Sequence, residues 1–572
     1  MNKIRTYLFA AVVLLVGMIA LGWGSRPKVE TLDSSSFSAE RVVKDIEVIS
    51  RNLHSVAQPE ERGQVRNYLV SRLEQLGADT VMQFEYKDLT GPENKHVKYT
   101  FDAINILATF APEQDAWDKT YLLLVAHYDS RFSQPFVKGD TVWSYGAADD
   151  GYGIGVILET VNQALKYRKE WKQGVKVLFT DAEEAAMMGM KAMWKHNREQ
   201  FDDVGLMMNF EARGPYGPAL LFETSPGNEK VMDLYKAVAE YPFTYSLTTV
   251  VYQFMPNYTD FTIVKDEIPG LNFSTIADIN HYHTNLDNFS NVDVKSIQHY
   301  GSQAVPVVRK YLTEEKYSDR GSLKSDSDTI NFTLPLLGLF NFSTAEYVLL
   351  NVVIFILFVG VVVFDVLRKR ANVGEVALGA LKVLALAIVA MLVGELIAYI
   401  CCVVAGAQFK LFGVVQGVMF DNIAMALAVV LMVLPVVVAY IRKRKKVICF
   451  SAGSLRAKAG SSAVALNAAN KLYGTLLLMM ILSAVLLVFI KENLMFFIPL
   501  FASVLAVVLY RLTKLKVWIL LAIALILLHA FSFLYALAMA LTIGAFGAVL
   551  MLALIDVMAL IPLADIYMTD KK

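Results

Sequence analysis

A series of long apolar blocks in the C-terminal part of the chain restricts its fold more than any other feature. Lipid offers the backbone no hydrogen-bond partners, so a single segment that crosses a bilayer must be a helix of about 20 apolar residues. Most of the blocks reach that length, and residues 347–572 are therefore predicted to form a membrane domain of about seven transmembrane helices. The blocks are Tyr347–Val366, Val376–Val403, Asn422–Ile441, Leu472–Ile490, Leu494–Tyr510, Val517–Met539 and Leu541–Leu563.

A further apolar segment lies near the N-terminus. Leu8–Trp23 follows the basic residues Lys3 and Arg5 and is either a cleaved signal peptide or a retained anchor. It has no clean small-x-small cleavage site with a polar follow-on, so we expect an anchor over residues 1–24. Basic clusters follow alternate C-terminal blocks and then all fall on the side of the N-terminus, which the positive-inside rule makes cytoplasmic. Residues 25–320 are therefore predicted to lie outside the cytoplasm.

The composition limits the partners of the chain. A formal net charge of zero gives no basis for binding nucleic acid. The 55% hydrophobic content is too high for a purely soluble protein, and its excess lies in the apolar blocks, which makes the lipid bilayer a partner. The three cysteines lie in or beside those blocks, so no disulfide holds residues 25–320 together. Residues 321–346 are expected to be a linker.

The globular part alternates between strand-like and helix-like segments. This alternation predicts an α/β fold with a mostly parallel mixed sheet that is flanked by helices on both faces. The expected strands are Thr80–Tyr86, Ile104–Phe110, Tyr121–Ala126, Val175–Thr180, Gly205–Phe210, Ala219–Glu223 and Gly270–Ile276. The expected helices are Phe37–Leu53, Arg62–Leu76, Gly151–Tyr167, Ala185–Gln200 and Asn228–Glu240.

The stretch Tyr121–Gly155 is the first candidate for a functional site. The apolar run Leu122–Ala126 has the pattern of a buried parallel strand, and it stops at His127 and Asp129. Asp149 then precedes a small-residue entry into a helix. Ligands of open α/β sheets bind at the carboxyl ends of the strands, and imidazole with carboxylate is a typical zinc-ligand set. A His-x-Asp triplet is common by chance, so the prediction depends on partners downstream.

Three further strand ends carry such partners. Glu183 and Glu184 follow one expected strand, Glu211 ends another, and His283 follows a third. Adjacent glutamates can divide the work, since one can bind a metal while the other accepts a proton. Taken alone, the glutamate pair is better explained by the preference of acids for helix N-termini, and a lone histidine is more often a core or surface residue. Acids and histidines at four strand ends together favour a metal site.

The short sequence motifs in and around these positions resemble those of a known protein family. They are AHYDS, ADDGYG, AEEAAMMG, MNFEARG, YTDF and HYHTNLDN. In order and spacing they are similar to the co-catalytic di-zinc aminopeptidases, which include bacterial secreted aminopeptidases, Fxna-like endoplasmic reticulum metallopeptidases and fungal vacuolar membrane proteases. The resemblance covers Phe37–Leu312. The last two groups also join this domain to an N-terminal span and a polytopic tail.

The resemblance implies a cofactor of two Zn²⁺ per chain and a set of ligands. His127 and Glu211 would hold one ion, Glu184 and His283 would hold the other, and Asp149 would bridge both.

The resemblance also implies three catalytic roles. Glu183 would be the general base, and Asp129 would orient the imidazole of His127. Tyr282 would help the metal to stabilise the oxyanion.

The family pattern is not matched everywhere. The choice of Asp149 rather than Asp150 as bridge rests on the family spacing, and in the family the peptide after the bridge is often cis. Where the family has Gly-Leu and Ser, this chain has Ala186–Met187 and Tyr152. Tyr152 and the pair Met187–Met188 are therefore expected to narrow or line the pocket.

The expected function is that of a membrane-anchored zinc metallopeptidase, an aminopeptidase that removes N-terminal residues from peptides outside the cytoplasm. The alternatives are a non-catalytic receptor or chaperone, a glutaminyl-cyclase-like transferase with one zinc, and a transporter-associated protein on the same fold. A bacterial plasma membrane is the expected location, and the alternative is an endoplasmic reticulum or vacuole membrane with a lumenal peptidase domain.

Overall fold

The computed structural model describes residues 2–22, 27–90, 100–113, 120–131, 143–253, 257–418 and 457–568. The chain divides into two compact units. The first, called here the α/β unit, comprises Gly24–Thr333 and Leu337–Thr344. The second, the helical unit, comprises Met1–Trp23, Leu334–Leu336 and Ala345–Lys572.

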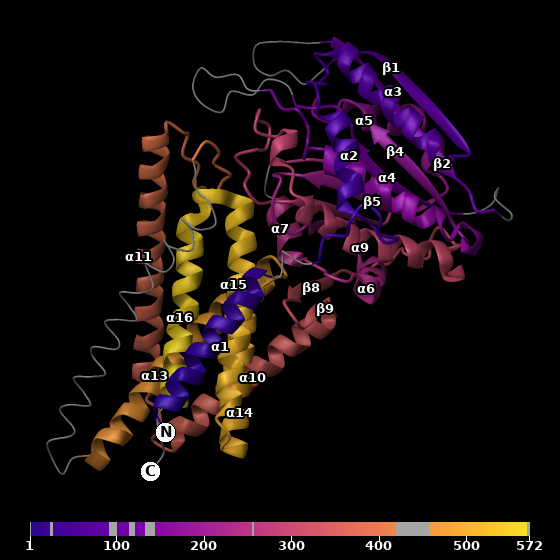
Figure 1. The fold of residues 1–572 in the computed structure, drawn as a ribbon. Coiled ribbons are helices and arrows are strands. Elements are labelled where there is room, and N and C mark those ends of the chain that lie inside the picture. Colours follow the sequence, from indigo (N-terminus) through magenta and orange to yellow (C-terminus); the bar gives the residue numbers. More distant parts are fainter. Residues whose placement is uncertain are drawn as a thin grey trace. The chain divides into compact units, whose positions relative to one another are not determined.

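The α/β unit is built on one seven-stranded sheet with the order β1-β2-β4-β3-β5-β7-β6 (Figure 1). The four neighbouring strands β4, β3, β5 and β7 are parallel, whereas β1, β2 and β6 pair antiparallel with their neighbours. The strands are β1 (Thr80–Thr90), β2 (Thr100–Phe110), β3 (Tyr121–His127), β4 (Gly174–Thr180), β5 (Val204–Ala212), β6 (Leu220–Thr224) and β7 (Gly270–Thr275). The predicted α/β class with a mixed, centrally parallel sheet is confirmed.

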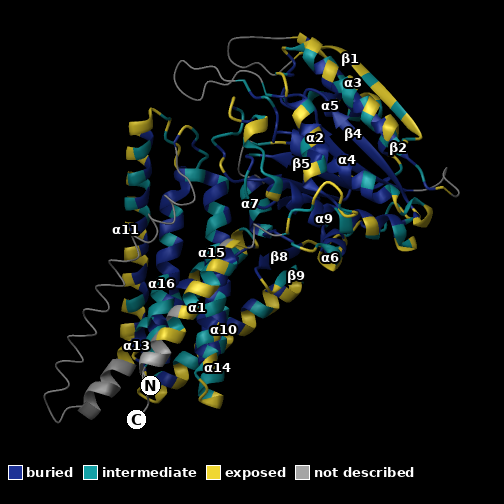
Figure 2. Ribbon diagram, viewed as in Figure 1, coloured by how far each residue is buried: buried dark blue, intermediate teal, exposed yellow. Residues whose placement is uncertain are grey.

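Helices cover both faces of this sheet, so its central strands are buried (Figure 2). Because side chains alternate along a strand, Leu122 and Leu124 of β3 join one hydrophobic core, and Leu123 and Val125 join the other. Each buried leucine contributes about 1.5–3 kcal/mol. The first core is completed by α2 (Ala39–Ile49), α3 (Pro59–Gln75), α4 (Gly151–Leu165), α6 (Glu229–Val238) and α9 (Val294–Thr313), and the second by α5 (Met188–His196) and α8 (Asp260–Val264).

Several elements differ from the sequence-based expectation. The helices α8, α9 and α7 (Ser246–Gln253) were not anticipated. The expected helix Ala185–Gln200 begins only at Met188, because a turn with left-handed residues precedes it. These left-handed residues lie beside Glu183 and Glu184, so the departure falls on the candidate site.

The expected linker, residues 321–346, is partly a β-hairpin. Its strands β8 (Thr329–Leu334) and β9 (Gly338–Ser343) form a separate two-stranded sheet, and β8 is buried throughout. Thr333 donates its backbone N–H to the carbonyl of Thr244 at 2.9 Å. Most of this stretch therefore belongs to the α/β unit, whose last residue is Thr344.

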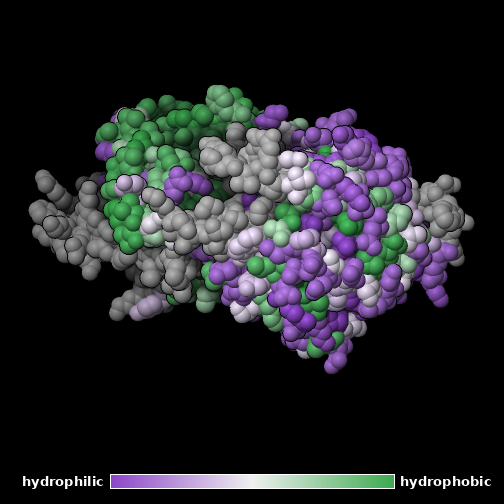
Figure 3. All heavy atoms as spheres, turned by 90° about the horizontal axis from the view of Figure 1, so that it is seen from above, coloured by the Kyte–Doolittle hydropathy of each residue, from purple (hydrophilic) through white to green (hydrophobic). Residues whose placement is uncertain are grey.

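Among the residues that the structure describes, the helical unit contains five segments that are long and apolar enough to cross a membrane. They are Thr344–Leu367, Val373–Ala405, Leu466–Ile490, Leu494–Thr513 and Val517–Met568. The last contains two helices, α15 (Val517–Leu541) and α16 (Phe546–Met568). The expected span Asn422–Ile441 lies outside the described residues. On the face seen in Figure 3, the described residues of this unit are largely hydrophobic, and together with the apolar segments this indicates a multi-pass membrane protein.

The N-terminal segment forms helix α1 (Asn2–Gly22), in which Tyr7–Ala20 is apolar. Helix α1 packs against α15 within the helical unit, where Gly17 lies beside the ring of Phe531. The predicted anchor is therefore helical over most of its length.

Small residues let the helices of the helical unit approach closely. Gly379 of α11 (Val373–Ala405) faces Gly474 of α13 (Ala457–Phe489), and Gly394 of α11 faces Gly547 of α16. Packing of this kind stabilises helix pairs in lipid, where the hydrophobic effect between helices is absent.

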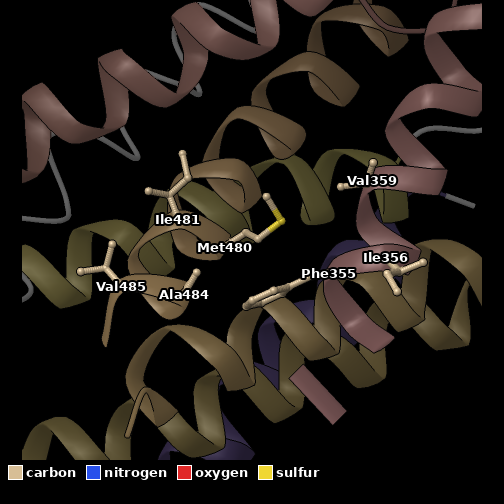
Figure 4. Close-up of a pocket in the computed structure, with 7 residues that line it drawn as sticks. All are labelled: Phe355, Ile356, Val359, Met480, Ile481, Ala484 and Val485. Atoms are coloured by element: carbon tan, nitrogen blue, oxygen red, sulfur yellow. The ribbon is translucent and has the colours of Figure 1, made fainter. Parts of the chain in front are cut away.

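An apolar groove of about 510 Å³ lies between α13 and α10 (Thr344–Leu367) (Figure 4). It is lined by Phe355, Ile356, Val359, Met480, Ile481, Ala484 and Val485.

Candidate metal centre

Four neighbouring parallel strands bring the candidate residues to one edge of the sheet. His127 is the last residue of β3, and Glu211 lies at the end of β5. Glu183 and Glu184 follow β4 directly, and His283 lies in the turns after β7. Because the strands are parallel and adjacent, their carboxyl ends meet at this edge, as predicted.

Asp149 lies between the two histidines. Its Oδ1 atom is 3.3 Å from Nε2 of His127, and its Oδ2 atom is 3.3 Å from Nε2 of His283. The other two acids complete the pairs: Glu211 Oε2 is 3.7 Å from Nε2 of His127, and Glu184 Oε1 is 3.0 Å from Nε2 of His283. The structure therefore brings all five expected ligands together as two groups that share Asp149, with the ligand atoms of each group within 4.8 Å of one another.

The spacing of these atoms fits metal ions better than hydrogen bonds. Asp149 Oδ2, Glu184 Oε1 and His283 Nε2 are buried and have no hydrogen-bond partner, although they lie close together. Two ligands about 2.0–2.1 Å from one tetrahedral zinc ion lie about 3.3 Å apart, which is close to the separations seen here. The donor set and its geometry therefore fit two divalent cations.

The electrostatics of the cluster lead to the same conclusion. Burial raises the pKa of the Glu211 carboxyl well above its usual range; His127 opposes this shift, and Asp150 and Asp149 add to it. Burial also acts to raise the pKa of Glu184, but the charges of His283 and Arg131 outweigh it and hold that pKa below its usual range. Several acids buried this close together repel one another, and cations between them would relieve this repulsion.

Asp150, the residue after the proposed bridging ligand Asp149, caps a helix instead. Its Oδ1 atom accepts the backbone N–H of Gly153 at 3.0 Å as the N-cap of α4, and its Oδ2 atom accepts the N–H of His127 at 3.3 Å. The peptide between Asp149 and Asp150 is cis, as the family resemblance implies. Since Asp150 is used as a cap, Asp149 is the aspartate that remains free to bind metal.

Asp129 holds the turn that carries the two glutamates. Its carboxylate accepts the backbone N–H of Glu183 at 2.9 Å and that of Glu184 at 3.2 Å. The same carboxylate lies 3.6 Å from Nδ1 of His127, whose closer neighbour is the backbone carbonyl of Asp129 at 2.9 Å. The Asp129 side chain is thus placed to fix the glutamate turn as well as the imidazole.

Replacing Asp129 by asparagine is predicted to lower kcat/KM by roughly 10–100-fold, the usual effect of removing a residue that orients metal ligands. One of the two carboxylate oxygens becomes an amide donor, so one glutamate N–H loses its acceptor. Steady-state kinetics at saturating zinc measure this change. An unchanged kcat/KM would contradict the positioning role.

Glu183 and Tyr282 border the same cluster. Burial raises the pKa of Glu183 well above its usual range, and the charge of Glu211 adds to the shift. The Tyr282 ring stacks on the His283 ring with a centroid distance of 3.6 Å. Burial, with Asp149 and Glu184 nearby, raises the pKa of the Tyr282 phenol, so it stays protonated and able to donate.

Two supporting residues were not anticipated from the sequence. Arg131 donates from Nη1 to the carbonyl of Glu184 at 2.5 Å and to its Oε2 atom at 3.1 Å. Asp287 accepts the backbone N–H groups of Ala148 at 2.6 Å and Asp149 at 3.3 Å. Both positions lie near predicted ligands in sequence, but an isolated Arg or Asp gives no periodic or spacing signal.

The departures from the family pattern have a structural explanation. Ala186 and Met187 both have left-handed backbone angles, with φ of 70° and 57°, so the first of them takes a conformation that favours glycine. Tyr152 is fully buried, donates to the carbonyl of Pro215 at 3.0 Å and accepts the N–H of Asp293 at 2.7 Å. The expectation that Tyr152 lines the pocket is therefore wrong, because it is fixed in the core.

The fold and the residues at the strand ends define an α/β domain with a candidate two-metal centre of histidines and carboxylates. Residues 105–308 match the model of the peptidase family M28, and the α/β unit carries a domain of that family.

Curated relatives each match a part of the chain. Endoplasmic reticulum metallopeptidase 1 of Rattus norvegicus is 26% identical over 234 residues, which cover 40% of this chain and 24% of the relative. The vacuolar membrane protease of Candida tropicalis is 28% identical over 351 residues, which cover 59% of this chain and 36% of the relative. The chain thus spans about a quarter to a third of the length of the curated relatives that it matches.

Solved structures of similar domains include a Zn-dependent exopeptidase of Parabacteroides distasonis, with 18% identity and a TM-score of 0.37 over 48% of this chain and 98% of that chain. They also include the glutaminyl cyclase of Porphyromonas gingivalis, with 19% identity and a TM-score of 0.39 over 49% of this chain and 100% of that chain.

Proposed function

We propose that the protein is a membrane-anchored di-zinc metallopeptidase that removes N-terminal residues from peptides outside the cytoplasm. The observation that carries the proposal is the position of Asp149, whose two carboxylate oxygens each lie 3.3 Å from a different histidine. A carboxylate so placed, with one further acid beside each histidine, suits the bridging of two divalent cations. The family match supports peptide hydrolysis as the reaction.

The proposed ligands are His127 and Glu211 for one ion and Glu184 and His283 for the other, with Asp149 shared. Two zinc ions held there would supply Lewis-acid chemistry and would make water a nucleophile near neutral pH. The side chains of the chain itself then orient the substrate and move the proton.

Glu183 is proposed to accept the proton of the attacking water and to return it to the leaving amine. Its backbone N–H is fixed by Asp129, which keeps the carboxylate beside the ligands without making it one of them. Tyr282 is proposed to donate a hydrogen bond to the oxyanion, since its ring is held flat against that of the ligand His283.

The proposed location of the α/β unit follows from the basic clusters. They follow alternate apolar blocks, which supports a location of the unit on the side of the membrane away from the cytoplasm. Protease protection of the α/β unit in sealed vesicles of known orientation tests this.

Removing the metal is predicted to abolish hydrolysis and to destabilise the α/β unit. Restoring zinc to about 100 times its dissociation constant should add about 2.7 kcal/mol to the free energy of unfolding, which corresponds to roughly 5–10 °C in the unfolding temperature. Thermal unfolding of the detergent-solubilised chain with chelator, and again after zinc is restored, measures both effects. If the unfolding temperature did not change when zinc was added, the proposal that buried ligands hold the metal would be contradicted.

An unblocked peptide and its N-acetylated twin test the direction of cleavage. We expect zinc-dependent release of the first residue from the free peptide and none from the acetylated one. Equal cleavage of both would exclude an aminopeptidase. Binding of the peptides without cleavage, at full zinc content, would instead support the non-catalytic receptor or chaperone.

A further inference from the structure

The basic side chains around the candidate centre differ in whether they have an anionic partner. Arg131 is engaged by Glu184 through two contacts, and Lys265 is paired with Glu223 at 2.5 Å. Arg213, in contrast, makes no ion pair and no side-chain hydrogen bond with any part of the chain that the structure describes, and its Nε atom is buried without an acceptor. A guanidinium that is partly withdrawn from water and left without an anion is costly.

Arg213 is held at the border of the metal centre from two sides. Its backbone N–H donates to the carbonyl of Thr275 at 2.8 Å, which extends the ladder between β5 and β7 by one residue. Side chains two residues apart on a strand point to the same face, so Arg213 lies on the face of Glu211. Its guanidinium carbon lies 5.7 Å from the centre of the Tyr282 ring, and that ring stacks on His283.

The contact with Tyr282 fixes the guanidinium in place without using its hydrogen-bond donors. A cation over an aromatic face is attracted by the ring, and the planar fork of N–H groups stays available. The ligand that such a fork fits best is a carboxylate, which it binds through two parallel hydrogen bonds. No acid of the centre forms an ion pair with Arg213 in the part of the chain that the structure describes; Glu184 contacts Arg131 instead, and the five proposed ligands would be taken up by the metals.

We propose that Arg213 binds a carboxylate of the peptide substrate and thereby makes the enzyme select peptides with an acid group close to the bond that is cut. The proposal rests on the proposed peptidase function and names its substrate class. The carboxylate can come from the C-terminus of a short peptide or from an Asp or Glu side chain. In both cases the guanidinium of Arg213 would hold the substrate beside Tyr282, which is the proposed oxyanion donor.

Two pairs of matched peptides test the proposal with the full-length protein in detergent and saturating zinc. The first pair is a short neutral tripeptide as its C-terminal acid and as its C-terminal amide. The second pair is a C-amidated tripeptide with Glu or Gln in the middle position. In the wild type we expect kcat/KM to be roughly 10–100-fold higher for the acid of at least one pair, the usual effect of a hydrogen bond to a charged group. The pair that shows the preference identifies the source of the carboxylate.

In the Arg213→Met variant, the ratio of kcat/KM for the acid peptide to kcat/KM for its neutral twin is expected to fall close to one. Arg213→Lys should give an intermediate ratio, because lysine keeps the charge but loses the fork. Arg309 provides a matched control. Its guanidinium also lies over a tyrosine ring, that of Tyr167, at 5.1 Å from the ring centre. Tyr167 comes just after the C-terminal end of α4, whereas the metal centre lies at the N-terminal end of this helix, about 20 Å away. Arg309→Met should leave the ratio unchanged.

Three outcomes would overturn the proposal: equal rates within both pairs in the wild type, a preference that survives in Arg213→Met, or a preference that is lost equally in Arg309→Met. These outcomes differ from a failure of the peptidase function, which would appear as no zinc-dependent cleavage of any of the four peptides. Zinc content of the Arg213 variants, measured on the same samples, shows that a lost preference is not a lost metal centre.

Discussion

Replacing Glu183 by alanine should lower kcat by roughly 10²–10⁴-fold while the zinc content of the protein stays unchanged. The side chain lies next to the ligand Glu184 in sequence, but it belongs to neither of the two groups that can hold an ion. Its removal therefore takes away a proton acceptor and leaves all five proposed ligands in place.

The experiment compares kcat and metal content in the wild type, Glu183→Ala and Glu183→Gln. Glu199→Ala is the matched control, since Glu199 is an exposed glutamate of the same domain outside the candidate centre. It should behave as the wild type in both measurements. If Glu183→Ala kept its turnover, or lost its zinc together with its turnover, the assignment of Glu183 as the general base would be wrong.

Replacing Asp149 by alanine should have the second large effect, a loss of both metal ions and of all zinc-dependent turnover. This carboxylate is the only group shared by the two ligand sets among the described residues, and its two oxygens point at different histidines. Without it, each ion keeps only two of its proposed protein ligands. Like-charged ions close to each other would also lose the anion between them.

Asp150→Asn is the control for this variant. Asparagine keeps one acceptor oxygen, which can still take the N–H of Gly153 and cap the helix about as well as aspartate. The N–H of His127 loses only a long contact of 3.3 Å. We expect full zinc content and nearly wild-type turnover. The reverse result, in which zinc is lost from Asp150→Asn and kept in Asp149→Ala, would exchange the roles of the two aspartates.

Much of the α/β unit could be predicted from the sequence because its signals are local. The buried parallel strands β3 and β4 are nearly continuous apolar runs, and Gly77 and the glycines at the start of α4 mark ends of helices. The helices α7 and α8 were missed, since short elements carry too few periodic positions, and the 20-residue helix α9 was missed as well. The hairpin β8–β9 was taken for a linker because its strands are short and follow a polar stretch.

The five proposed ligands could be named from the sequence because its motifs resemble those of the di-zinc aminopeptidases, and the strand ends of a parallel sheet were expected to bring most of them together. The metal-binding role of each stays a prediction, although the structure places all five in two groups. What the sequence could not indicate is which neighbours support them. The backbone hydrogen bonds to Asp129, Asp150 and Asp287 depend on how loops fold back, and no spacing rule describes that.

Arg213 illustrates the same limit. In the sequence it is one basic residue shortly after a proposed ligand, and no pattern sets it apart. Its meaning depends on the absence of a partner within the described part of the chain and on the ring of Tyr282, which is about 70 residues away in sequence. Only the folded chain brings these two side chains together.

The most direct measurement is a crystal structure of the zinc-loaded protein with anomalous scattering recorded at the zinc edge. The account predicts two peaks about 3.5–4 Å apart, one beside His127 and Glu211 and one beside Glu184 and His283, with Asp149 between them. A single peak, or zinc bound away from these side chains, would contradict it.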